Sequence, residues 1–149
     1  AETADIRQEI WLKLLLNASG NTLSALTRLS NVHRAALPEL ERLGAAVVLE
    51  IAEIAKASGW TLPEDRILAA SKTPSNSANP YSSMLQDVFS GRLLEVEPIV
   101  GQPQVFARHL NIPTPVIDVL LPLLRGLNFH LQLGKKDERA TAGFERLPT

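Results

Sequence analysis

A lysine and two asparagines, Lys13, Asn17 and Asn21, stand four residues apart in an early stretch whose other residues are almost all apolar or small. Four residues advance a helix by about 400°, so the three side chains share one stripe that drifts by about 40° per step. A helix that is apolar on nearly every other side is expected to be buried. An unpaired buried donor costs about 1–3 kcal/mol, so these groups need polar partners. The stripe is therefore either a structural polar seam or a site for a polar ligand.

A second group of polar residues lies near the middle of the chain, where SSMLQD at residues 82–87 precedes Glu95. Taken alone, this pattern favours an ordinary helix start, in which Ser82 or Ser83 accepts a hydrogen bond from a free first-turn amide. Glu95 then reads as a surface acid. The charged residues Glu39, Glu41 and Arg42 are likewise most simply a solvated helix face.

Several classes of chemistry find no support in the sequence. The three histidines, at positions 33, 109 and 130, show no metal-ligand spacing, and no metal site is expected. No serine stands in a G-x-S-x-G elbow, and no G-x-G loop is present to hold a phosphate or dinucleotide. A net charge of −1 suggests neither nucleic acid nor a membrane surface as a partner. The absence of cysteine excludes disulfides and points to a reducing, cytoplasmic location.

Helical periodicity accounts for the first half of the chain. Asp5 is a candidate N-cap for a first helix that carries the lysine–asparagine stripe and continues to about Ser30. The pattern breaks around residues 31–33. Pro38 then begins a long helix, with acidic residues in its first turn, and Gly59 ends it as a left-handed cap.

Shorter helices are expected in the second half. They cover residues 64–70 and 82–91, a segment starting at Pro98 and bent by Pro103, and a last helix from Val116 to Leu127 that Pro122 perturbs. The expected buried side of the Pro98 helix is Ile99, Val105, Phe106 and Leu110. Residues 71–79 form a polar loop, no apolar run is long enough to span a bilayer, and no strand alternation appears. We therefore expect an all-α bundle of about six or seven helices over residues 1–132, followed by a polar tail over residues 133–149.

Four motifs in this order resemble the C-terminal domain of the ketopantoate reductases, the 2-dehydropantoate 2-reductases of pantothenate biosynthesis. They are W-x-K-L-x-x-N-x-x-x-N-x-L-S-A-L-T at residues 11–27, SSMLQD at 82–87, G-R-x-x-E from residue 91, and NIPTP at 111–115. The resemblance runs from about Ile6 to Leu127. It implies the helical fold of the 6-phosphogluconate dehydrogenase C-terminal domains.

The resemblance also implies roles for individual residues. Lys13 matches the lysine that donates a proton to the keto oxygen. Asn17 and Asn21 match substrate-binding asparagines, and Asn31 falls where some members place a further one. Ser83 matches the serine that holds the substrate, and Glu95 matches the acid that meets the lysine and the nicotinamide end of the cofactor. A fixed ammonium suits hydride addition to a ketone, since it stabilises the growing negative charge and supplies a proton.

The same resemblance implies partners. These reductases bind NADPH mainly through an N-terminal Rossmann domain that is absent from this sequence, and the catalytic pocket lies between the two domains. We expect the chain to be inactive alone, to act on ketopantoate when joined to that domain, and to self-associate as a homodimer through exposed apolar helix faces. Two alternatives stay open: a reductase domain of the same fold for another 2-oxo acid, and a helical dimerisation module without catalytic ancestry, in which the site residues would be dispersed.

Overall fold

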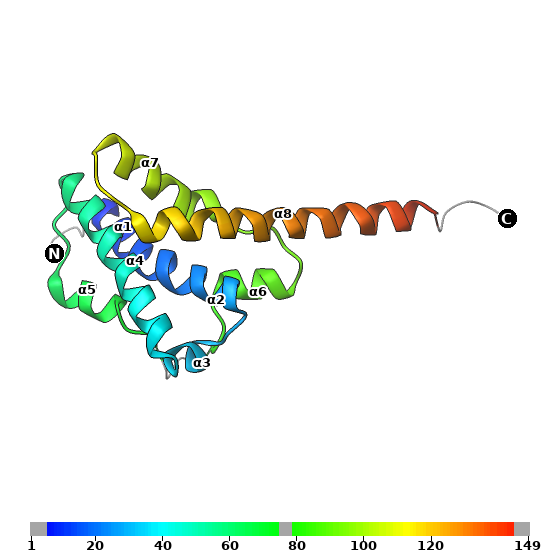
Figure 1. Ribbon diagram of the computed structural model, residues 1–149, viewed down its shortest axis with the longest axis horizontal. Coiled ribbons are helices and arrows are strands. Elements are labelled where there is room, and N and C mark those ends of the chain that lie inside the picture. The colour runs from blue at the N-terminus through cyan, green and yellow to red at the C-terminus, as the bar shows by residue number, and fades with distance from the viewer. Residues whose placement is uncertain (1–5, 75–78, 145–149) are drawn as a thin grey trace.

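The computed structural model describes the backbone of residues 6–74 and 79–144, and side chains up to Lys135 (Figure 1). Within these ranges it contains eight α-helices and two π-helical turns, and no strand. Both π turns continue directly into neighbouring α-helices, so the chain forms seven continuous helical segments. The prediction of an all-α fold with six or seven helices is confirmed.

The first continuous helix carries the lysine–asparagine stripe. It consists of α1 (Ile6–Leu16), the π turn η1 (Asn17–Asn21) and α2 (Thr22–Thr27). Inside η1 the Ser19 hydroxyl donates to the Leu15 carbonyl at 3.0 Å, a back-bond that often bends a helix. The helix ends at Arg28, whose φ of 63° is left-handed, slightly before the predicted end at Ser30. The predicted cap Asp5 lies outside the described residues.

A short helix, α3 (Asn31–Ala35), occupies the stretch where the periodicity predicted only a break, so that prediction is wrong. Its start is specified by a cap and not by an apolar stripe, because the Ser30 hydroxyl accepts from the His33 amide at 3.4 Å. The backbone amide of Asn31 donates to the Pro80 carbonyl at 2.8 Å. This bond holds α3 beside the segment that leads into α6.

The long helix α4 (Pro38–Ala57) is the centre of the bundle and has the predicted bounds. Pro38 stands in its first turn, and Gly59, with φ of +90°, follows its end. Its buried stripe contacts α1, α5, α7 and α8, and includes Val47, Val48, Ile51, Ile54 and Ala55. The following helix α5 (Glu64–Ala70) also matches its prediction.

The next part contains α6 (Ser83–Phe89), the π turn η2 (Glu97–Gly101) and α7 (Gln102–His109). The predicted buried side of the last segment is only partly correct. Ile99 is buried, but Val105 and Phe106 are 44% and 49% exposed, and Leu110 is also exposed. A π turn bonds residues five apart and rotates everything after it relative to a regular helix. Pro103, Gln104 and Ala107 therefore face the core instead.

The last helix, α8 (Pro115–Phe144), lies along the longest axis of the molecule and extends beyond the other helices (Figure 1). The Glu50 carboxylate of α4 accepts from the Val116 and Ile117 amides at 2.8 and 2.9 Å, which caps the N-terminus of α8. The helix continues to Phe144, well past the predicted end at Leu127 and through the segment predicted as a polar tail. Its Lys, Glu, Arg and Ala residues are good helix formers.

The sequence-based expectation of no membrane-spanning length also needs correction. The segment Pro115–Lys135 of α8 is a 21-residue helix with a mean hydropathy of 1.2, long and apolar enough to cross a bilayer by length and composition. The core helix of a water-soluble domain meets the same criterion. The first turns of α8 serve as such a helix, since Ile117, Leu121 and Leu124 are fully buried.

Candidate substrate pocket

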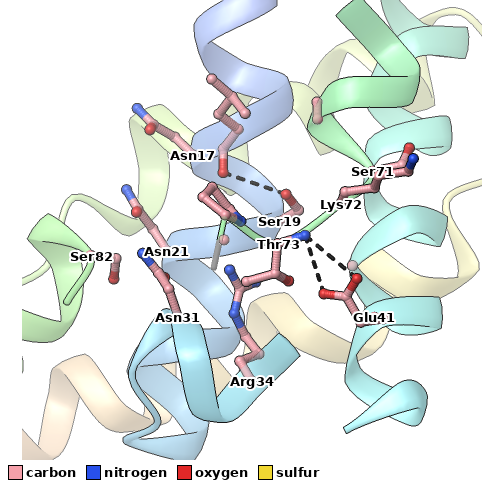
Figure 2. Close-up of a pocket in the computed structure, with 15 residues that line it drawn as sticks. Asn17, Ser19, Asn21, Asn31, Arg34, Glu41, Ser71, Lys72, Thr73 and Ser82 are labelled. Atoms are coloured by element: carbon pink, nitrogen blue, oxygen red, sulfur yellow. Dashed lines mark hydrogen bonds between the residues drawn. The ribbon is translucent and has the colours of Figure 1, made fainter. Parts of the chain in front are cut away.

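The π turn η1 aligns two of the three stripe residues. A turn closed by bonds between residues five apart holds more residues than an α-helical turn, so residues four apart stay on the same side of the helix. Figure 2 shows the Asn17 and Asn21 side chains leaving this helix on the same side. Asn21 is 8% exposed and Asn17 is half-buried. π turns are frequent at functional sites, and this one presents two neighbouring amides.

The Asn21 amide also connects η1 to a segment distant in sequence. Its Nδ2 donates to the Ser83 Oγ at 3.4 Å, across 62 residues. Ser82, and not Ser83, is the N-cap of α6, because the Ser82 Oγ accepts from the Leu85 amide at 3.2 Å. The exposed Ser83 hydroxyl is thus not used in capping and lies against Asn21.

A cavity of about 210 Å³ opens beside these residues, between η1, α3, α4 and the segment after α5. We call it the polar cavity. In Figure 2 the Asn31 amide lies next to that of Asn21, with Ser82 across from them. The polar residues in its lining are Asn17, Ser19, Asn21, Asn31, Arg34, Glu41, Ser71, Lys72, Thr73 and Ser82.

Arg34 contributes a buried cation to the polar cavity. Its side chain is 4% exposed, and its Nε has no hydrogen-bond partner. The guanidinium lies beside η1 at Gly20, where an added Cβ would be 3.5 Å from an Arg34 terminal nitrogen. Burial lowers the pKa of the Arg34 guanidinium, and the Glu41 carboxylate opposes that decrease. Among the described residues, no ion pair within 4.0 Å involves Arg34.

Glu41 lines the same cavity from α4, so its interpretation as part of a solvated face is wrong. Its carboxylate accepts from the Thr73 amide at 3.2 and 3.5 Å, a contact drawn as dashed lines in Figure 2. The other two members of that charged group do face solvent, where Arg42 and Glu39 approach to 3.9 Å. Glu41 therefore helps to hold the segment after α5 as one wall of the cavity.

Lys13 and Glu95 lie outside the lining of the polar cavity. Both are exposed, and no ion pair joins them in the part of the chain that the structure describes. The expectation of a helix buried on all sides is therefore wrong for α1, where Leu16 and Ile10 are 50% and 54% exposed. Lys13 stands one turn before Asn17 on the same helix, and Glu95 shortly precedes η2, which contacts η1.

Sequence reasoning missed Arg34, Lys72 and Thr73 as parts of the cavity. Arg34 fell in the supposed break, and the other two fell in a loop without periodicity. Arg34 is recognised only in the folded chain, where it is buried beside Gly20. Among the residues described, no group of three acidic, histidine or cysteine side chains is arranged to hold a metal ion.

A larger hollow of about 380 Å³ lies elsewhere, between α1, the end of α4 and the η2–α7 segment. We call it the apolar hollow. Trp11 and Phe106 meet there edge to face, with ring centroids 6.4 Å apart. Its lining also includes Trp60 and Leu14, and it holds none of the predicted site residues.

The chain belongs to the family described as "Ketopantoate reductase PanE/ApbA C terminal", which matches residues 5–128. This family is the helical C-terminal domain of the fold that ketopantoate reductases share with 6-phosphogluconate dehydrogenase.

Named relatives agree with this assignment. A 2-dehydropantoate 2-reductase of Mesorhizobium japonicum is 36% identical over 126 residues, which are 83% of this chain and 37% of that protein. A PanE/ApbA family ketopantoate reductase from Ralstonia eutropha superposes with a TM-score of 0.79 at 31% identity, over 87% of this chain and 44% of that one. The dimeric ketopantoate reductase from Staphylococcus aureus gives 0.77 at 29% identity, over 86% and 45%. The chain thus spans well under half of these relatives.

Proposed function

We propose that this chain is the substrate-binding and catalytic domain of an NADPH-dependent oxidoreductase that reduces a 2-oxo acid. Ketopantoate, which would be reduced to pantoate for pantothenate biosynthesis, is the first candidate because the named relatives are 2-dehydropantoate 2-reductases. The observation that carries the proposal is the convergence of Asn17, Asn21 and Asn31 on one cavity, with Ser83 bonded to Asn21. A dimerisation module would have no reason to gather these residues.

In this proposal each polar group has a task that suits its chemistry. The asparagines and Ser83 bind carbonyl and hydroxyl oxygens of the substrate without adding charge. Lys13, exposed one turn before Asn17, donates the proton to the keto oxygen, and its ammonium stabilises the charge that develops there. Its exposure fits a group that works at the mouth of a cavity, facing a second domain.

The bound nicotinamide supplies the hydride in this chemistry. The described residues contain no strand and no glycine-rich loop that would hold its pyrophosphate, whereas the Glu95 carboxylate is exposed and would meet the nicotinamide end in this proposal. The fit is therefore to the reactive end of the cofactor only. A Rossmann domain is the proposed partner for the remainder, in a cytoplasmic enzyme, and a second copy of the chain is the proposed dimer partner by analogy with the Staphylococcus aureus protein.

A reconstitution assay tests this proposal. The chain is fused after the N-terminal domain of the Mesorhizobium japonicum relative, and ketopantoate-dependent NADPH oxidation is measured. We expect turnover from the fusion and none from the chain alone. Lys13→Ala should lower kcat by about 100-fold or more, the usual contribution of general acid catalysis. Lys56→Ala, an exposed lysine at the end of α4, is the matched control. Equal loss in both variants, or turnover by the isolated chain, would contradict the proposal.

A 2-oxo acid other than ketopantoate should be tested in the same assay, because of the charge inside the polar cavity. The polar cavity contains the buried Arg34 guanidinium, and ketopantoate carries a hydroxyl, not an anion, at the end distant from its keto group.

A further inference from the structure

We propose that Arg34 is a specificity-determining residue that binds a second carboxylate, at the far end of the substrate, so that the polar cavity favours dicarboxylic 2-oxo acids. This inference rests on the proposed function, because it takes the asparagine cavity as the substrate site. It names the class of 2-oxo acid and leaves the reaction unchanged.

Arg34 carries a buried charge that lacks an ion-pair partner in the part of the chain that the structure describes. A buried charge without an ion-pair partner is costly, and here the Nε has no hydrogen-bond partner at all. Glu41, the nearest opposite charge, is hydrogen-bonded to the Thr73 amide, and no ion pair within 4.0 Å joins it to Arg34 among the described residues. A planar guanidinium with free donors is the group best suited to a carboxylate, which it binds through two parallel bonds.

Lys13 and the Arg34 guanidinium lie at different places along the first helix. The guanidinium lies against Gly20, seven residues after Lys13, which is about 10 Å along the axis at 1.5 Å per residue. The carboxylate of any 2-oxo acid is bonded directly to the keto carbon. A substrate whose keto oxygen meets Lys13 therefore keeps that carboxylate near Lys13, and only its opposite end reaches Arg34. Along the helix axis, Asn17 lies between the two cations, beside the middle of such a substrate, and Asn21 lies one residue beyond Gly20.

The lining of the polar cavity contains two other charged residues. Lys72 adds a second cation to the lining, whereas Glu41 adds one carboxylate. The Thr73 amide donates to that carboxylate, so part of the negative charge of Glu41 is already compensated.

The test compares two ligands of equal chain length by isothermal titration calorimetry on the full chain. 2-Oxoadipate ends in a carboxylate, and 2-oxohexanoate ends in a methyl group. We expect 2-oxoadipate to bind at least about tenfold more tightly, the value of one charged hydrogen-bonded contact. Arg34→Gln should abolish that preference, and Arg34→Lys should retain part of it. Thermal melts of each variant establish that the fold is kept.

Glu41→Gln separates this proposal from a purely structural role for Arg34. Removing the Glu41 carboxylate, which repels an anionic ligand, should leave the preference for 2-oxoadipate unchanged or increase it. If Arg34 and Glu41 were a purely structural pair, Arg34→Gln and Glu41→Gln would lose stability equally and neither would change the affinity for either acid. Equal affinities for the two acids in the unmodified chain would overturn the inference and leave the proposed function standing. If neither acid binds to the unmodified chain, the proposed function fails first.

Discussion

The strongest stability prediction concerns Glu50, which joins the two longest helices. Its carboxylate accepts from the Val116 and Ile117 amides at 2.8 and 2.9 Å, and Ile117 is fully buried. In Glu50→Ala these amides lose their acceptor. A hydrogen bond to a charged group contributes about 1.5–3 kcal/mol. The two bonds share one half-buried carboxylate, so their contributions do not simply add. We expect a loss of about 2–4 kcal/mol in the free energy of unfolding.

The assay is thermal unfolding followed by circular dichroism, supported by urea titration. For a chain of this size, about 1 kcal/mol corresponds to roughly 2–4 °C, so Tm should fall by about 4–16 °C. Glu53→Ala is the matched control, because Glu53 is an exposed acid one turn later on α4. If the Glu50 and Glu53 variants unfolded at the same temperature, the capping of α8 by α4 would not contribute as argued.

Three further predictions concern the site and its supports. Asn21→Ala should weaken binding of 2-oxo acids in calorimetry and cost about 1 kcal/mol of stability, through the lost bond to Ser83; unchanged affinity would remove Asn21 from the site. Ser82→Ala should cost about 1 kcal/mol as a lost N-cap, whereas Ser83→Ala should affect ligand affinity more than Tm, and the reverse order would refute the division. The Arg125 hydrogen bond lowers the pKa of Glu97, so this exposed pair stabilises the fold only while Glu97 is ionised. Glu97→Gln should therefore differ from the unmodified chain by under about 1 kcal/mol at neutral pH, and the difference should vanish as the pH falls below the ordinary glutamate value of 4.5; a gap that grows in acid would contradict this.

The helices that sequence predicted well are those specified locally. Pro38 and the apolar stripe that follows lie within α4, Gly59 stands just past its end, and each acts through its immediate neighbours. The same holds for α5 and for the Ser82 cap of α6. Local rules of this kind are sufficient for the start, the end and the buried side of a regular helix.

The π turns are where sequence prediction lost accuracy. A stripe at 3.6-residue spacing carries no sign of bonds between residues five apart, so the rotation at η2 moved Val105 and Phe106 out of the core. At η1 the same geometry brought Asn17 and Asn21 together. The end of the last helix was predicted too early for a different reason, since the charge after residue 133 predicts solvent exposure but does not exclude helix.

The candidate site was predictable only through the resemblance to a family. The residues alone left an even choice between a polar seam and a ligand site. The resemblance named Asn31 and Ser83, which the fold places with Asn17 and Asn21, and Lys13 and Glu95, which lie outside the cavity. Arg34 was beyond either approach, because its burial against Gly20 depends on contacts between three separate helices.

The most direct test of the account is an NMR titration of the chain with ketopantoate, in which side-chain resonances are followed individually. We predict that the side-chain amide signals of Asn17, Asn21 and Asn31 shift together, while the indole signals of Trp11 and Trp60 in the apolar hollow stay in place. Shifts confined to the two indoles, or no shift at any of the three asparagines at saturating ketopantoate, would contradict the central claim that the polar cavity is a 2-oxo acid site.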